Sequence, residues 1–69
     1  MHPADIQAAI KKAGHSQATI AAELQVSRMA VSHIIHGRGK SRRIAVRIAQ
    51  VVAIPLSDLW PGKYQERLQ

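Results

Sequence analysis

The sequence predicts an all-α fold, a compact domain of five helices within 69 residues. Apolar residues recur at helical spacing in successive segments, and each segment is bounded by a capping residue, a glycine or a proline. These apolar residues are mainly aliphatic, because the chain has no Phe and its one Trp is Trp60. A chain of this length is near the lower limit for one hydrophobic core, so we expect a single domain over residues 1–69.

The first helix is expected to begin near Pro3, where a missing N–H costs nothing, and to end at Gly14. Asp5 lies in the first turn and complements the helix dipole. Ile6 and Ile10 stand four residues apart and define the apolar stripe of this helix.

Residues 17–37 are the most informative part of the chain, because they predict two short helices joined by a tight turn. Ser16 and Ser27 are good N-caps for the first and second of these helices. Apolar side chains share one face of each helix, and a methyl group at the expected crossing lets the helices approach closely. The inward residues are Ile20, Ala21, Leu24, Val31, Ile34 and Ile35. This is the pattern of a helix-turn-helix, whose second helix enters the DNA major groove.

Two further helices follow a loop at residues 37–41, which contains two glycines and ends at the N-cap candidate Ser41. Residues 42–53 have a helical period, with Ile44, Ile48, Val51 and Val52 inward, and Pro55 ends this helix. The segment LSDLW at 56–60 predicts a short fifth helix whose large apolar side chains close the core. We expect a loose tail from about residue 63.

The net charge of +6 predicts a polyanionic partner. No acidic residue stands between Glu23 and Asp58, whereas six of the ten basic residues do. A solvated face usually mixes both signs, so nucleic acid explains this distribution better. The six are Arg28, Arg38, Lys40, Arg42, Arg43 and Arg47.

Several other classes of protein are excluded by the composition. The absence of Cys excludes disulfides and fits a reducing cytoplasm, and no apolar run approaches the length of a membrane span. No signal peptide precedes the first helix, so we expect a cytoplasmic protein associated with the nucleoid and not with a membrane.

Enzyme activity is not expected. The carboxylates Asp5, Glu23, Asp58 and Glu66 are scattered along the chain. The segment GRGKS ends like a phosphate-binding P-loop, but Ile34 stands where that motif requires its first Gly and a helix precedes it in place of a strand.

Metal binding is not expected either. His33 and His36 are three residues apart, yet two imidazoles do not complete a zinc site and no Cys or carboxylate stands nearby in sequence. Contact with DNA or simple exposure to solvent explains them better. We therefore expect no metal, no cofactor and no small-molecule ligand.

Three segments resemble the lambda-repressor-like helix-turn-helix class, and more closely the Ner-type regulators of transposable phages and their bacterial relatives. These segments are HPADIQAAIKK at 2–12, SQATIAAELQVSRMAVSHII at 16–35 and IPLSDLWPGKY at 54–64. Many helix-turn-helix proteins have Gly at the ninth motif residue, where this chain has Gln25. Because Gln is strained in a left-handed conformation, we expect this turn to be built differently.

The helix-turn-helix pattern also predicts which residues contact DNA. Arg28 is the strongest candidate for a base contact, since a guanidinium can donate to both O6 and N7 of guanine, although a phosphate contact is its alternative. Met29 offers an apolar surface to a thymine methyl if it is exposed and does not pack in the core. Ser32 and His33 complete the candidate base-contact set.

Phosphate contacts are expected around this set. Resemblance to lambda-type repressors gives Gln17 a bridging role at a phosphate, while an ordinary first-turn polar residue is an equal alternative. Cations in the loop and at the start of the next helix are placed to bind the DNA backbone. The candidates for phosphate contact are Gln17, Ser27, His36, Arg38, Lys40, Arg42 and Arg43.

These features together predict a sequence-specific regulator of transcription that binds double-stranded DNA, more specifically a repressor. The alternative is a protein-binding antitoxin or adaptor that retains a helix-turn-helix, and RNA binding is weaker still because two aromatics make no stacking platform. One recognition helix reads few base pairs, so we expect a weak homodimer or pairing on DNA. Val46, Ala53 and residues 54–59 are the modest apolar surface for it.

Overall fold

The computed structural model describes residues 1–64 and places helices where the sequence pattern predicts them. The helices are α1 (Pro3–Lys12), α2 (Gln17–Leu24), α3 (Arg28–Ile35), α4 (Arg42–Val52) and α5 (Leu56–Leu59). Residues 1–64 contain these five helices and no strand, so the predicted all-α class is confirmed.

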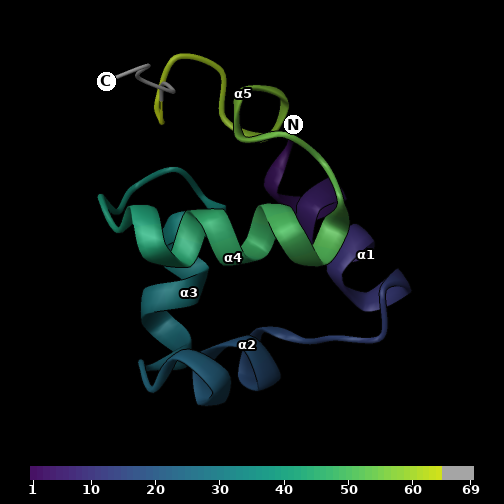
Figure 1. Cartoon of the computed structure of the whole chain (residues 1–69), viewed down its shortest axis with the longest axis vertical. Helices are drawn as coiled ribbons and strands as arrows, with labels where there is room; N and C mark the ends of the chain where they lie inside the picture. The colour runs from purple at the N-terminus through teal and green to yellow at the C-terminus, as the bar shows by residue number, and fades with distance from the viewer. Residues whose placement is uncertain (65–69) are drawn as a thin grey trace.

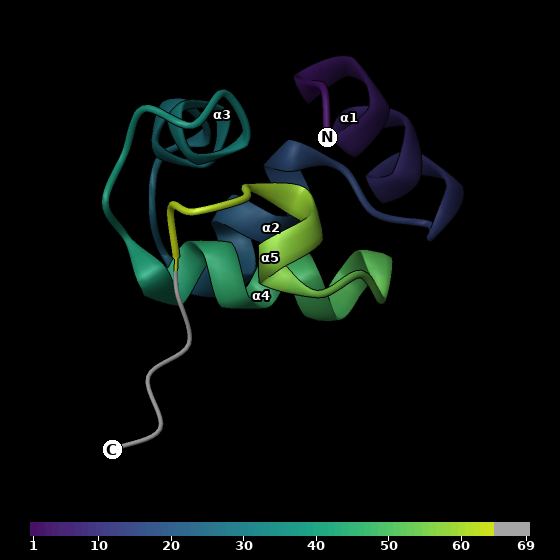
Figure 2. The ribbon, with the colours of Figure 1, turned by 90° about the horizontal axis from the view of Figure 1, so that it is seen from above.

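Helix α4 is the central element of the structure. It crosses the middle of the molecule in Figure 1 and packs against each of the other four helices. Helices α2 and α3 form a packed pair on one side of α4, while α1 lies at the other end of the molecule and also contacts α3. Figure 2 shows α3 and the loop that leads from it to α4 along the same side of the molecule.

The core consists of aliphatic side chains from all five helices, closed by the two aromatic residues of the chain. Ile6, Ile20, Ala45, Ile48 and Leu59 are completely covered. Val51 and Val52, which the helical period placed inward, are half-buried at the edge of this core. The other buried residues are Ile10, Ala21, Val31, Ile34, Ile35, Ile44, Leu56, Trp60 and Tyr64.

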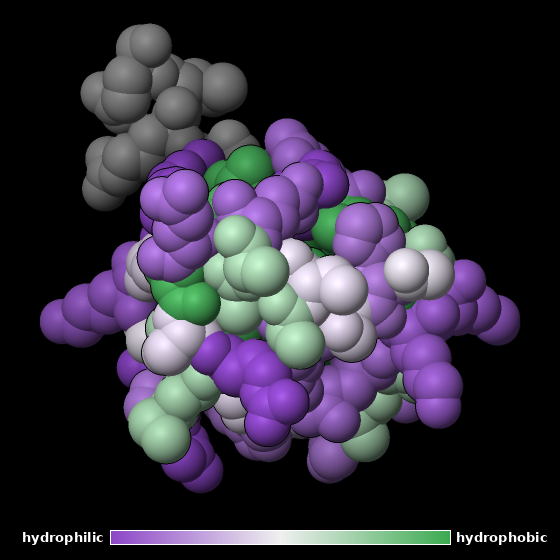
Figure 3. Space-filling model, turned by 90° about the horizontal axis from the view of Figure 1, so that it is seen from below, coloured by the Kyte–Doolittle hydropathy of each residue, from purple (hydrophilic) through white to green (hydrophobic). Residues whose placement is uncertain are grey.

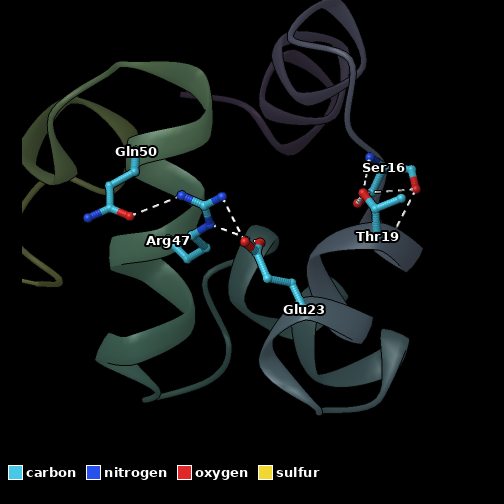
Figure 4. Close-up of polar contacts among 5 residues, drawn as sticks. All are labelled: Ser16, Thr19, Glu23, Arg47 and Gln50. Carbon is cyan, nitrogen blue, oxygen red and sulfur yellow. Dashed lines mark hydrogen bonds and ion pairs between the residues drawn. The ribbon is translucent and has the colours of Figure 1, made fainter.

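Capping side chains define where the helices begin. The predicted caps are confirmed at Ser16, Ser27 and Ser41, each of which accepts a hydrogen bond from a backbone N–H in the first turn. Ser16 and Thr19 form a reciprocal capping box, shown in Figure 4, in which each hydroxyl accepts from the other residue's backbone N–H. His2 caps α1 through Nδ1, a role that the sequence pattern did not predict.

The segment after α5 is packed more firmly than predicted. Trp60 and Tyr64 are both at least 93% buried, with ring centroids 5.3 Å apart in an edge-to-face arrangement. The predicted loose tail therefore does not begin at residue 63. Residues 65–69, which were also assigned to that tail, lie outside the described residues.

The apolar surface that was predicted for pairing is smaller in the structure than in the sequence. Leu56 and Leu59 point into the core, because α5 packs against α4. The prediction that residues 54–59 offer their apolar side chains to a partner is therefore wrong for these two leucines. Val46 and Ile54 are half-buried, and Ala53 is exposed.

An ion pair joins α2 to α4. The Arg47 guanidinium donates to both carboxylate oxygens of Glu23 at 2.9 Å, and a further N–H donates to Gln50 (Figure 4). These hydrogen bonds hold the pKa of Glu23 below its ordinary value of 4.5. Arg47 lies in the stretch of sequence that contains no acid, but Glu23, which precedes this stretch, balances its charge.

We expect this ion pair to stabilise the fold at neutral pH and to lose its effect in acid. Because folding lowers the pKa of Glu23, the contribution is present above pH 4.5 and is lost as the pH falls through the folded-state pKa. A double-mutant cycle of Glu23→Gln and Arg47→Gln, followed by urea unfolding, should show favourable coupling at about pH 7 and none at about pH 2. Equal coupling at both pH values would contradict an ionic origin.

Candidate nucleic-acid interface

The turn between α2 and α3 sets how these helices cross. Gln25 adopts a left-handed conformation, with φ 58° and ψ 45°, and the next residue, Val26, donates its backbone N–H to the Ala21 carbonyl at 2.9 Å. The expectation that Gln25 would force a different turn is therefore wrong. The strain of about 1–2 kcal/mol for a residue with a Cβ is offset by the packing of α2 on α3, where Ala21 is 4% exposed.

The outer face of α3 carries the four candidate base-contact residues. Arg28 and His33 are exposed, and Ser32 is half-buried. Met29 is 67% exposed, so its alternative as a core residue is wrong. The opposite face is in the core, since Val31, Ile34 and Ile35 are at most 2% exposed.

The first residue of α2 shares a surface with this face. Gln17, Arg28, Met29 and Ser32 together line an open hollow of about 410 Å³. The structure therefore brings Gln17 beside three of the base-contact candidates, although it stands eleven residues before Arg28. Figure 3 views the molecule from the end where α2 lies, and white and green residues in the middle of this face are bordered by strongly hydrophilic ones.

Two of the predicted phosphate contacts already serve the ends of α3. The Ser27 hydroxyl accepts from the Ala30 backbone N–H at 3.1 Å and so caps the helix. His36 Nδ1 lies 2.9 Å from the Ser32 carbonyl. Because a carbonyl only accepts, Nδ1 carries the proton in this contact, and Nε2 is the nitrogen left for another partner.

The remaining candidates follow α3 along the chain. Arg38 and Lys40 are exposed in the loop, and Arg42 and Arg43 are exposed in the first turn of α4. One guanidinium nitrogen of Arg43 donates to the Leu24 carbonyl at 2.8 Å, at the C-terminal end of α2. Arg43 therefore holds α4 against α2 in addition to the phosphate contact predicted for it.

The charge around this face has one sign. Residues 24–57 contain no acid, and Glu23 is paired with Arg47. Figure 2 shows that α3 and the following loop, which hold Arg28, Arg38 and Lys40, lie along one side of the molecule. This side offers an exposed helix with polar side chains next to a basic loop, which is the surface that a DNA groove and its phosphates require.

Two residues that the sequence pattern did not indicate as part of this site hydrogen-bond to the backbone of α3 and of the basic loop. Trp60 Nε1 donates to the Ile35 carbonyl at 3.3 Å, at the end of α3. The Tyr64 hydroxyl donates to the Gly39 carbonyl at 3.2 Å, in the basic loop. Each bond joins residues 25 apart, so no local period or capping pattern signals it.

The described part of the chain holds neither a metal-binding cluster nor a membrane-spanning helix. Residues 1–64 hold no group of three or more His, Cys, Asp or Glu side chains arranged to bind a metal ion. None of their helices is long and apolar enough to cross a bilayer.

A family model described as winged helix-turn-helix DNA-binding matches residues 1–69. No significant match was found among curated proteins or among solved structures. The wing in that description has no counterpart in residues 1–64, where a loop and α4 follow the helix-turn-helix without a strand.

We expect Gln25→Gly to raise the free energy of unfolding by about 0.5–1 kcal/mol. The strain relieved at a left-handed residue, about 1–2 kcal/mol, exceeds the flexibility that Gly adds to the unfolded chain, about 0.4–1 kcal/mol. Gln25→Ala is the matched control, because it keeps Cβ and should bring no such gain. Urea unfolding measures both variants, and a Gly variant less stable than the Ala variant by about 0.4–1 kcal/mol would show that the turn carries no strain.

Proposed function

Because this chain belongs to the winged helix-turn-helix DNA-binding family, we propose that it is a sequence-specific regulator of transcription that reads the major groove with α3. One observation carries the proposal. The exposed polar face of α3 adjoins an exposed basic loop, and no acid lies in residues 24–57. Such a face suits base edges flanked by phosphates.

Base readout is assigned to the outer face of α3. Arg28 begins the helix, and its exposed guanidinium has the two-pronged geometry that guanine O6 and N7 accept. Met29 offers its exposed side chain to a thymine methyl group. Ser32 and His33 complete the set, and the half-buried Ser32 is short enough to let the helix lie deep in the groove.

Phosphate binding is assigned to the residues around α3, with roles limited by the bonds they already make. The Ser27 hydroxyl oxygen accepts from the Ala30 backbone N–H, so Ser27 would bind a phosphate by donating its own O–H. His36 Nδ1 lies against the Ser32 carbonyl, so Nε2 is the nitrogen it presents to a phosphate. The remaining phosphate contacts are assigned to Gln17, Arg38, Lys40, Arg42 and the other N–H groups of Arg43.

Repression is the regulatory role that these residues support. The helices of residues 1–64 pack around one core and leave α3 outward, so occupation of a promoter is an action they can perform by themselves. The proposed Ner-type assignment rests on the segments at 2–12, 16–35 and 54–64. In the last of these, Trp60 and Tyr64 donate to the end of α3 and to the loop after it.

Footprinting on the DNA upstream of its own gene tests this proposal. We expect protection over two half-sites about 34 Å apart, because one α3 reads too few base pairs to define a site. We also expect a monomer or weak dimer without DNA, since Leu56 and Leu59 are buried. Binding upstream no tighter than binding to random duplex DNA would refute a specific regulator, and a tight dimer in free solution would refute pairing on DNA.

Arg28→Ala should weaken binding to the specific site by about 1–3 kcal/mol and relax the preference at one base pair. The matched control is Arg38→Ala, which removes the same charge from the loop. It should weaken binding to all sequences alike and lower the salt dependence by about one unit. Gel-shift titrations on specific and random duplexes at several salt concentrations separate the two. If Arg28→Ala weakened both duplexes equally, Arg28 would be a phosphate contact.

A further inference from the structure

The basic loop after α3 is held at one residue, Gly39, from two sides. On the side of α3, the backbone of Gly39 passes close to the Ile34 side chain, since a Cβ at Gly39 would lie 2.5 Å from the terminal methyl group, Ile34 Cδ1. From the C-terminal segment, the Tyr64 hydroxyl donates to the Gly39 carbonyl at 3.2 Å. Gly39 is therefore clamped between α3 and Tyr64.

Tyr64 is itself rigidly placed. Its side chain is 7% exposed, and its ring meets Trp60 edge to face with an interplanar angle of 75°. Trp60 in turn donates to the last carbonyl of α3, that of Ile35. Burial raises the pKa of Tyr64, so the phenol stays protonated and remains a donor to Gly39 around neutral pH.

The two residues beside the clamped glycine are Arg38 and Lys40, both exposed. We infer that Tyr64 is a positioning residue for DNA binding, whose hydroxyl fixes Gly39 and thereby directs Arg38 and Lys40 to the phosphates. This inference rests on the proposed function and extends it to a residue with no place on the DNA-reading helix. Ordering the loop before binding lowers the entropy that DNA contact would otherwise cost.

Tyr64→Phe is the central variant, because it removes the hydroxyl and keeps the ring that packs on Trp60. In the full chain we expect DNA affinity to fall about two- to tenfold, the effect of losing one hydrogen bond. The salt dependence should fall toward that of Arg38→Ala/Lys40→Ala, since misplaced cations release fewer counterions. Adding Tyr64→Phe to that double variant should change affinity no further, because the cations it positions are gone.

Two more variants separate positioning from loss of stability. Ile6→Val thins the core at α1, away from the loop, and should leave the salt dependence unchanged while lowering the urea midpoint. Gly39→Ala crowds the Ile34 methyl group, and because Ile34 is packed in the core we expect the loop to move and the salt dependence to fall as in Tyr64→Phe. Circular dichroism and Trp60 fluorescence establish that each variant is folded at the titration temperature.

The outcomes distinguish this inference from the proposed function. Tyr64→Phe with wild-type affinity, or with an equal loss in the Arg38→Ala/Lys40→Ala background, would overturn the positioning role. Phosphate contacts are independent of sequence, so the same cycle can be measured on random duplex DNA. A wild-type chain without preference for any site would refute specific regulation, and the random-duplex cycle would still decide the role of Tyr64.

Discussion

The structure depends on how α2 and α3 cross, since these two helices pack closely against each other. The buried Ala21 adds only a methyl group to α2, and the left-handed Gln25 turns the chain between the two helices. Once this crossing is set, Val31, Ile34 and Ile35 are in the core, and Arg28, Met29 and His33 necessarily face solvent. The proposed DNA-reading face is thus the side of α3 opposite the residues that pack in the core.

Four of the arginines differ in what their guanidinium groups contact. Arg47 and Arg43 reach from α4 to α2, the first to the Glu23 carboxylate and the second to the Leu24 carbonyl. Both contacts hold the helix-turn-helix on its support. Arg28 and Arg38 are exposed along the side that carries α3 and the loop. The same residue type therefore contributes to assembly in one place and to the proposed recognition surface in another, and Arg43 has N–H groups for both.

The C-terminal segment supports the proposed interface without belonging to it. Trp60 and Tyr64 close the core as large apolar groups, and each also donates one hydrogen bond to a backbone carbonyl, Trp60 at the end of α3 and Tyr64 in the loop that follows. An aromatic ring with a polar tip suits this double use, because burial and a directed bond come from one side chain. Stability of the small core and placement of the basic loop are coupled through these two residues.

Apolar period and capping are local properties, so the helices, their caps at Ser16, Ser27 and Ser41, and the outward set on α3 could all be predicted from the sequence. The left-handed Gln25, the pairing of Arg47 with Glu23 and the contact of Tyr64 with Gly39 depend instead on how the helices pack. The two contacts join residues 24 and 25 apart in the sequence, and no short-range pattern encodes such neighbours. The strain at Gln25 is offset by packing between helices, which is not a local property either.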